Sequence, residues 1–244
     1  MSSQSKRNVN TYGPDGRLYQ LEYAMKAMNH GTLTLGVIHK DSVILVSEKK
    51  LVNSFVKNPL KKHFIIDDHL IMGFSGLSGD IRTVIEKSRK HALRHRSIYN
   101  EQISSEGLLK YLCSLAMKFS EKEEKKIFSR PLGVSLLLAS NDTKPMLYTF
   151  DPSGSFNKYK AKALGMGAEV ADEMLTKLVK EIDNLSIEEA MRKVIKIVAN
   201  IIKEDISVER IECVILKNNN IEYLDNKIKG MIDEIKEEIV RERS

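Results

Sequence analysis

The feature that most constrains the fold of this sequence is that short β-type runs come in pairs separated by turns. The runs are rich in β-branched and aliphatic residues, and polar residues such as His39-Lys40-Asp41 separate the partners. The first four runs are residues 32–38, 42–48, 63–67 and 70–75. Strands joined by so short a turn pair antiparallel, because a parallel neighbour needs a long crossover.

Helical periodicity also comes in pairs. Apolar residues recur at three- and four-residue intervals over residues 79–97, 104–120, 168–182 and 187–203. Ser104 or Ser105 is the expected cap of the second helix, and Ser186 with Glu189 matches a capping box. Single amphipathic helices are predicted near the two ends of the chain, over residues 17–29 and 226–242.

A second block of strands lies between the helix pairs, and a hairpin follows them. These runs are residues 132–140, 146–151, 155–162, 210–216 and 221–224. Helices that arrive in pairs each cover one face of a sheet. The pattern therefore predicts an α/β fold, a four-layer α/β/β/α sandwich of two antiparallel sheets.

The charge pattern sets limits on the partners. Lys and Arg number 39 against 33 Asp and Glu, so the net charge is +6, and the two signs are mixed along most of the chain. The exception is residues 82–96, where six basic side chains accompany the single acidic residue Glu86. This stretch is interpreted as the solvated face of one helix. The alternative is an RNA-binding helix, but no known RNA-binding motif supports it, and no nucleic-acid partner is expected.

The cysteines, the apolar runs and one histidine pair bear on compartment, membrane contact and metal binding. Cys113 and Cys213 lack CxxC spacing and are interpreted as reduced thiols of an intracellular protein. No apolar run approaches the roughly 20 residues of a membrane helix, so no membrane contact is expected. His91 and His95 share one helix face, but no third ligand accompanies them, and neither a metal nor a cofactor is expected.

A dense motif then points to a family. The segment NTYGPDGRLYQLEYA, residues 10–24, resembles the N-terminal signature of proteasome alpha subunits. Further matches are Gly31-Thr32, Ser75-Gly76-Leu77 with Asp80 and Arg82, Arg130 to Val134, and Asp151 to Gly154. The fold of that family is the same four-layer sandwich, with an N-terminal nucleophile hydrolase topology. The resemblance implies a gate tail over residues 1–13 and a single domain over residues 14–244.

Within the family, residues 9–11, 129–131 and 151–156 resemble the eukaryotic type-5 alpha subunit, with type 2 as the nearest competitor. The resemblance implies a non-catalytic ring subunit of the 20S core particle in ubiquitin-dependent degradation. Implied partners are other alpha subunits, with types 4 and 6 as ring neighbours, beta-ring subunits, and ATPase or other activator caps. The implied location is the cytoplasm and nucleus. An archaeal-type homo-heptamer remains an alternative.

The resemblance also suggests a competing function. Beta subunits of the family are threonine peptidases, and their nucleophile, acid and lysine fall on Thr32, Glu48 and Lys62. A self-processing peptidase with Thr32 as nucleophile is therefore the alternative. It requires a free amine as base, whereas the nitrogen of Thr32 is an amide behind 31 residues. The helix at residues 17–29, with its expected buried stripe, argues against removal of those residues.

Two further sites are implied by the resemblance alone. Lys62, Gly31 and Leu77 match the pocket that receives the C-terminus of an activator, where an ammonium pairs with a carboxylate. The competing interpretation places Lys61 and Lys62 on a solvated strand end. Gate and turn positions fall on Arg7, Pro14 and Tyr23, while Ser5 and Lys6 replace the usual tail tyrosine and aspartate.

Overall fold

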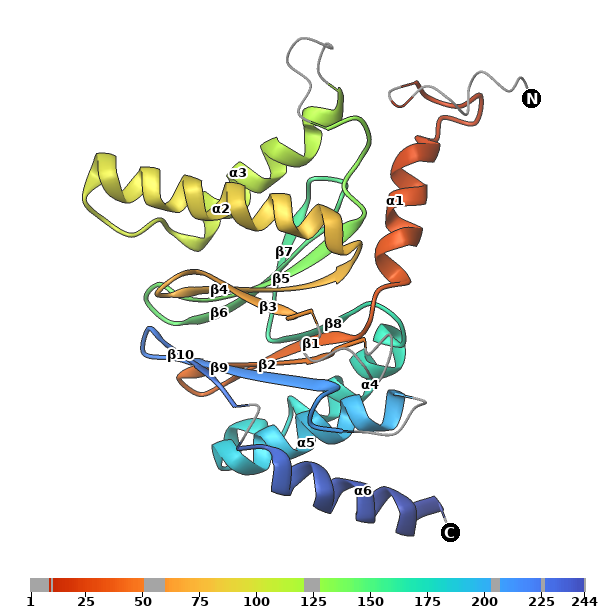
Figure 1. The fold of residues 1–244 in the computed structure, drawn as a ribbon, viewed down its shortest axis with the longest axis vertical. Helices are drawn as coiled ribbons and strands as arrows, with labels where there is room; N and C mark the ends of the chain where they lie inside the picture. Colours follow the sequence, from red (N-terminus) through yellow and green to blue (C-terminus); the bar gives the residue numbers. More distant parts are fainter. Residues whose placement is uncertain are drawn as a thin grey trace.

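Two five-stranded antiparallel sheets lie face to face at the centre of the computed structural model, with helices outside each sheet (Figure 1). The structure describes residue 9 and residues 11–50, 60–120, 128–202, 207–224 and 227–243. The predicted four-layer α/β/β/α sandwich is confirmed. Of the predicted gate tail, residues 1–8 and residue 10 lie outside the described residues.

The first sheet has the strand order β10-β9-β2-β1-β8. Its strands are β1 (Thr34–His39), β2 (Ser42–Glu48), β8 (Ala161–Leu164), β9 (Ile211–Lys217) and β10 (Asn220–Tyr223). The second sheet has the order β3-β4-β5-β6-β7. Its strands are β3 (His63–Asp67), β4 (Leu70–Gly76), β5 (Val134–Asn141), β6 (Pro145–Phe150) and β7 (Phe156–Tyr159). The first four strands along the chain are thus shared equally between the two sheets.

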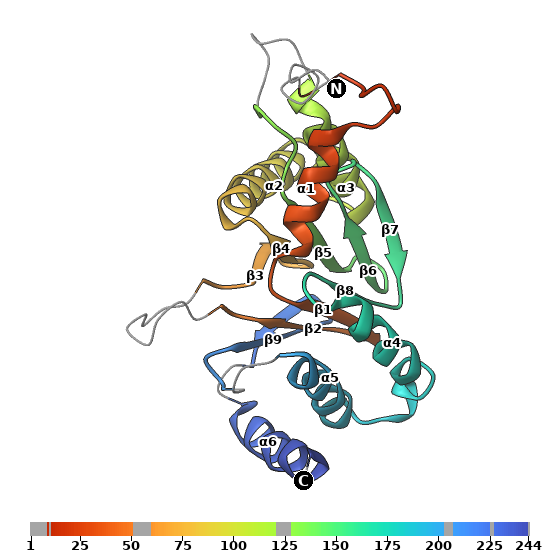
Figure 2. The same cartoon turned by 90° about the vertical axis from the view of Figure 1, so that its right-hand side faces the viewer.

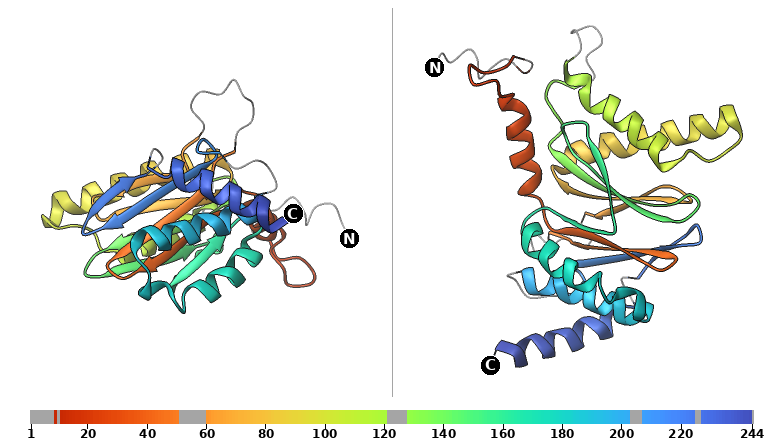
Figure 3. Two further views of the ribbon diagram at one scale, coloured as in Figure 1. Left: turned by 90° about the horizontal axis from the view of Figure 1, so that it is seen from below. Right: turned by 180° about the vertical axis from the view of Figure 1, so that it is seen from behind.

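Helices cover the outer face of each sheet, as the views from the side and from behind show (Figures 2 and 3). Helices α2 (Ser78–Tyr99) and α3 (Ser105–Ala116) pack on the second sheet, and α3 continues into a 3₁₀ turn, η1 (Met117–Ser120). Helices α4 (Ala168–Leu178), α5 (Ile187–Ile201) and α6 (Lys229–Arg243) lie below the first sheet, with a second 3₁₀ turn, η3 (Ile182–Asn184), between α4 and α5. No helix in the described part of the chain is both long and apolar enough to span a membrane.

Local signals begin two of these helices as predicted. The backbone N–H of Gly107 donates to Ser104 Oγ over 3.1 Å, so Ser104 rather than Ser105 is the N-cap of α3. The capping box of α5 is complete, because Glu189 N–H donates to Ser186 Oγ and Ser186 N–H donates to the Glu189 carboxylate. Each bond satisfies a donor that the first helical turn leaves without an intrahelical partner.

The predicted single strand over residues 155–162 is wrong. The chain pairs with β6 as far as Tyr159 and then crosses to the first sheet, where Ala161 begins the pairing of β8 with β1. The carbonyl of Lys160, at the crossing point, accepts the N–H of Ile38 in β1. Period-two alternation continues through the crossing, so the sequence pattern contains no sign that the pairing partner changes.

The apolar stripe predicted to be buried on the first helix is only half-buried. Helix α1 (Tyr19–Asn29) stands beside one end of the second sheet (Figure 2), and Ala24 is its only buried residue. The stripe residues Leu18, Leu21, Met25 and Met28 are half-buried. The helix contacts β4 and β5, and these contacts leave its apolar stripe partly exposed in the single chain.

Three apolar clusters hold the layers together. One joins the first sheet to α4, α5 and α6, and another joins the second sheet to α2 and α3. The third lies between the sheets and consists of Val43, Leu45, Ile71, Leu137, Ala139, Leu147, Val214 and Leu216. Burial of such side chains stabilises the fold by about 1.5–3 kcal/mol each before the loss of chain entropy is counted.

Candidate functional site

A cavity of about 540 Å³ opens where the link from α1 to β1 meets the end of β2 and the start of β3. Its wall includes Gly31, Thr32, Glu48 and Lys62, which the sequence placed at candidate positions. His30, Lys50, Leu60, Phe74, Gly76, Ser78, Met166 and Arg210 complete the lining. The structure therefore brings the predicted acid, hydroxyl and lysine into one site.

Lys62 is the most unusual of these residues. It precedes β3, its side chain is only 4% exposed, and its Nζ donates to Thr32 Oγ1 over 2.8 Å. The same nitrogen lies 4.3 Å from the centre of the Phe74 ring. Burial lowers the pKa of Lys62 to about 8, although the charges of Glu48 and Glu212 oppose that shift. The predicted alternative, a solvated lysine at a strand end, is wrong for Lys62 and fits the exposed Lys61.

Gly31 lies at the cavity for a steric reason. A Cβ at this position would come within 2.1 Å of Gly76 N and 2.2 Å of Ser75 Oγ, so the α1–β1 link touches the end of β4 directly. The Gly31 carbonyl also accepts the N–H of Met166 over 2.8 Å, and Ser75 Oγ donates to the Met28 carbonyl. The segment before Thr32 is therefore built into the fold on both sides.

Leu77, the third predicted pocket residue, is not part of the cavity lining. It is 44% exposed, and its side chain packs over Gly133 beside the lining residues Gly76 and Ser78. Asp80 fixes this corner, because its carboxylate accepts two hydrogen bonds from the Arg130 guanidinium and one from the Gly133 N–H. Leu77 therefore borders the site without facing the cavity.

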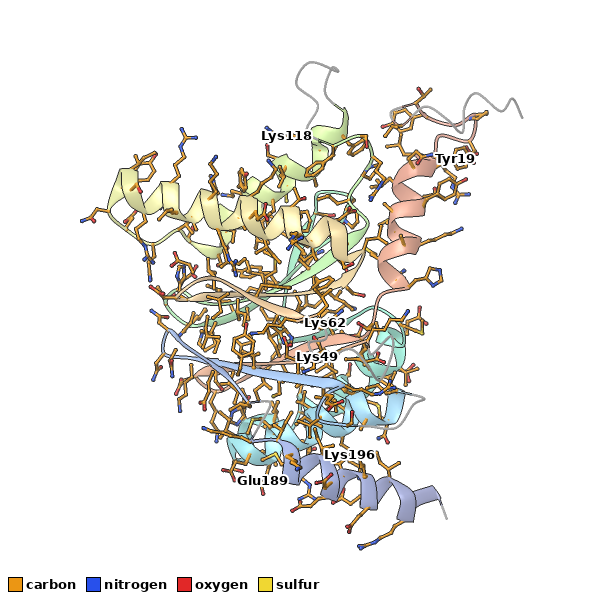
Figure 4. The ribbon with its side chains drawn as sticks, viewed as in Figure 1. Tyr19, Lys49, Lys62, Lys118, Glu189 and Lys196 are labelled. Atoms are coloured by element: carbon orange, nitrogen blue, oxygen red, sulfur yellow. The ribbon has the colours of Figure 1, made fainter. Side chains whose placement is uncertain are left out.

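The predicted gate residues lie at the far end of α1. Arg7 is outside the described residues, while Pro14 is exposed in the turn before the helix and Tyr23 is exposed on it. The turn is closed by Tyr19 Oη donating to Asp15 Oδ1 over 2.9 Å and by an ion pair between Arg17 and Glu22. Figure 4 shows Tyr19 at the outer end of α1, whereas Lys62 and Lys49 lie at the level of the sheets.

A buried polar cluster beside the cavity was not predicted. The carboxylate of Glu212 in β9 is 1% exposed, and its Oε1 accepts the N–H groups of Lys62 and His63 over 3.1 and 2.7 Å. The side chains of His63, Ser47 and Thr34 continue the cluster between the sheets. A signal was present in the sequence, because Glu212 is the one charged residue within the apolar run IECVIL.

The basic stretch on α2 has structural partners. Arg89 Nε donates to the Ile65 carbonyl over 2.8 Å, and Arg96 pairs with Asp67 at the end of β3 and with Asp68 in the turn that follows. These contacts tie the helix to the edge of the second sheet and favour the interpretation of a helix face over a nucleic-acid site.

The two histidines of α2 are also accounted for by contacts within the fold. The ring of His91 stacks on Tyr111 with centroids 3.9 Å apart, and His95 Nδ1 lies 3.3 Å from the Glu101 carbonyl. Partial burial and the nearby charges of His95 and Arg94 lower the pKa of His91. Within the described ranges, no group of three His, Cys, Asp or Glu side chains is arranged to hold a metal ion.

Comparison with known proteins identifies the family. The sequence profile described as "Proteasome subunit" matches residues 28–216, which include the cavity, the second sheet and all of the first sheet except β10 and the last residue of β9. The chain belongs to the proteasome subunit family. A second profile, which describes the N-terminal signature of A-type proteasome subunits, matches residues 7–27 and marks the chain as alpha-type rather than beta-type.

Individual relatives agree with this assignment. A probable type-5 alpha subunit of the proteasome from Encephalitozoon cuniculi is 46% identical over 222 residues, which cover 90% of this chain and 94% of that protein. The similarly named protein of Schizosaccharomyces pombe is 39% identical, with 86% of each chain covered. A proteasome alpha subunit of Methanocaldococcus jannaschii is 33% identical over 94% of this chain and 87% of its own. The predicted resemblance to type-5 subunits is confirmed. Alpha subunits of this family assemble with other alpha subunits and with beta subunits in the core particle.

Proposed function

We propose that this alpha-type subunit provides a docking pocket for the C-terminal carboxylate of an activator tail. The observation that carries the proposal is the buried amine of Lys62 in the wall of the 540 Å³ cavity. With a pKa of about 8, this amine is protonated in about nine tenths of the molecules at pH 7. A carboxylate that enters the cavity would meet a cation with little competing water, where an ion pair is stronger than at the surface.

The chain offers a matched control for this proposal. Lys61 and Lys62 are adjacent, but Lys61 is exposed and lies over the Tyr223 ring, with 4.9 Å between Nζ and the ring centre. We expect Lys62→Ala in the assembled core particle to lower activator-stimulated peptide hydrolysis severalfold, while Lys61→Ala leaves it within error. Basal hydrolysis should be the same in both. Unchanged stimulation in Lys62→Ala would remove the pocket assignment.

We further propose that the subunit is not itself a peptidase. Thr32 Oγ1 and Lys62 Nζ are within hydrogen-bond distance, but the nitrogen of Thr32 is an amide. Helix α1 and the Gly31 contacts hold the preceding segment against the fold, which supports an uncleaved chain. Intact-mass measurement of the purified subunit tests this, because a mature chain that begins at Thr32 would restore the peptidase hypothesis.

A gating role for the tail is proposed on the resemblance of Arg7, Pro14 and Tyr23 to gate positions. Ser5 and Lys6 replace a phenol and a negative charge, so we expect the open state of this tail to differ from the usual one. The test is to delete residues 2–9 and compare basal peptidase rates of the assembled particle. A rate that does not rise would show that this tail does not obstruct the pore.

The proposed ring neighbours are alpha subunits of types 4 and 6, in a particle located in the cytoplasm and nucleus. The support is the similarity to proteins named type-5. Native mass spectrometry of the purified particle would distinguish a hetero-heptameric ring from a homo-heptamer. A homo-heptamer would overturn the proposed neighbours and leave the pocket proposal in place.

A further inference from the structure

One carboxylate oxygen organises the residues that hold Lys62 in place. Oε1 of Glu212 accepts the N–H of Lys62 over 3.1 Å and that of His63 over 2.7 Å, and it lies 3.0 Å from His63 Nδ1. The side chains of Glu212 and His63 are 1% and 0% exposed. A carboxylate removed from water to this degree must be matched by donors or by a positive charge.

The position of Lys62 explains why this contact matters. Strand β3 is an edge strand, and its pairing with β4 begins at His63, opposite Gly73. Lys62 therefore lies just outside the ladder, and its N–H is held by Glu212 from the other sheet. The direction in which the Lys62 side chain leaves the backbone is fixed by that bond.

The hydrogen bonds around His63 determine which of its ring nitrogens carry protons. Thr34 Oγ1 donates its only proton to the Phe74 carbonyl over 2.8 Å, and Ser47 Oγ donates its only proton to Thr34 Oγ1 over 2.9 Å. Ser47 Oγ can therefore act only as an acceptor toward His63 Nε2, which lies 2.8 Å away. The Nε2 atom must carry a proton.

The opposite ring nitrogen must carry one too. Nδ1 makes no hydrogen bond of regular geometry in the described part of the chain, and it lies 3.0 Å from Glu212 Oε1, close enough for an ion pair. An unprotonated Nδ1 would set its lone pair against a carboxylate oxygen. Burial would raise the pKa of Glu212, but the hydrogen bonds and charge of His63, with the charge of Lys49, lower it. The negative charge on Glu212 and the second proton on His63 therefore stabilise each other. The charges that act on this pair and on Lys62 include Lys49, which follows β2, and Glu48 at the end of β2, and Arg210 lines the same cavity.

We propose that Glu212 is the positioning residue of the Lys62 site and that it holds His63 as a buried imidazolium. This inference rests on the proposed function in one respect, since it takes the Lys62 cavity as the docking pocket. The protonation of His63 is independent of that assignment. The pair brings one negative and one positive charge, so it fixes the backbone of Lys62 without changing the net charge of the pocket.

Nuclear magnetic resonance of the full chain with ¹⁵N-labelled histidine tests the protonation. We expect both ring nitrogens of His63 to carry protons in the folded chain at pH 7, with the signal assigned by its loss in His63→Gln. In Glu212→Gln the amide oxygen still accepts the backbone N–H groups, but no anion holds the second imidazole proton, and Nδ1 should lose it. A wild-type ring that carries a single proton at pH 7 would overturn the inference.

Binding of a fluorescent peptide with a free C-terminal carboxylate to the assembled particle tests the positioning, with the amidated peptide as the blank. We expect Glu212→Gln to stay within about threefold of wild type, because the acceptor for the Lys62 N–H remains. Glu212→Ala removes this acceptor. Glu212→Asp moves the carboxylate away from the Lys62 N–H by the length of one methylene. Both variants should therefore bind the peptide at least tenfold more weakly. Glu212→Asp keeps the charge and supplies the result if the alanine variant does not fold.

Wild-type affinity in folded Glu212→Ala or in Glu212→Asp would overturn the positioning role. Lys62→Ala in the same assay separates the two proposals. If that variant binds the peptide normally, the docking pocket fails, while the histidine resonances still decide the state of His63.

Discussion

The space between the two sheets changes character along its length, and β2 and β9 show the change most clearly. Their paired residues are Val43 with Leu216, Leu45 with Val214, and Ser47 with Glu212. Successive pairs are two residues apart, so all three face the same side of the sheet. The first two pairs belong to the apolar cluster, whereas the third begins the polar cluster beside the cavity.

The inward-facing residues of β2 and β9 therefore perform two tasks. The apolar pairs hold the sheets together by non-directional burial, which tolerates small shifts. The polar end holds His63 and the Lys62 backbone through directional bonds, whose geometry is specific. Substitutions in the apolar part and in the polar part should therefore have different effects.

The largest effect is expected in the apolar part. Leu45→Ala removes a side chain that is 1% exposed and leaves a cavity between the sheets. We expect the free energy of unfolding of the chain to fall by about 2–5 kcal/mol, with no change in the protonation of His63. Denaturant titration at fixed protein concentration measures this. Leu45→Met, which nearly conserves volume, is the control and should cost less than about 1.5 kcal/mol.

The next effect is expected in the polar part. Ser47→Ala removes the acceptor of the His63 Nε2 proton and the donor to Thr34, both in a fully buried setting. We expect a loss of about 1–3 kcal/mol in unfolding free energy, the cost of an unsatisfied buried group. The same titration measures it. A loss smaller than about 1 kcal/mol, the value typical of an exposed serine cap, would show that water replaces the hydroxyl and enters the cluster.

The third effect is a difference in chemical reactivity between the adjacent residues Lys62 and Lys61. The pKa of Lys62 is lowered to about 8, so its neutral, nucleophilic form grows as pH rises through 8, far below the ordinary titration of an exposed lysine near 10.4. We expect acetylation by a trace of a small anhydride at pH 7.5 to be about tenfold faster, or more, at Lys62 than at Lys61, with half the maximal rate near pH 8. Peptide mass spectrometry measures both sites. Equal rates would show that Lys62 keeps its proton or is shielded from the reagent.

The smallest effect is expected at the surface. Ser186→Ala removes a serine hydroxyl as Ser47→Ala does, but from the exposed cap of α5. We expect a loss of about 1 kcal/mol, because water replaces part of the bond. Denaturant titration again measures it. A cost equal to that of Ser47→Ala would mean that burial adds nothing to the polar cluster.

Local patterns predicted most of the fold. Periodicity located the helices and strands, and short turns indicated antiparallel pairing. The exception at residues 155–162 arose because alternation specifies which way side chains point but not which strand is the neighbour. The apolar stripe of helix α1 was predicted to be buried but is half-buried, because the sequence does not reveal how much of the helix surface the second sheet covers.

The candidate site was predictable in part. Resemblance placed Thr32, Glu48 and Lys62 at matching positions, and the structure brings them to one cavity. It also assigned Leu77 to the pocket, where the side chain turns toward Gly133 instead. The Glu212–His63 pair was missed because its members are 149 residues apart and meet only when the sheets stack.

The crowding at Gly31 limits how the cavity can diversify among related chains. A Cβ at Gly31 would meet Gly76 N at 2.1 Å, and one at Gly165 would meet the Thr32 and Gly31 carbonyls at 2.7 and 2.8 Å. Every single substitution at these two positions is a large step, because even alanine does not fit. Gradual change is open instead at Leu60 and Met166, which are 52% and 61% exposed on the cavity rim. Substitutions at these two rim positions would therefore change the chemistry of the cavity entrance, while the backbone packed around Gly31 and Gly165 stays as it is.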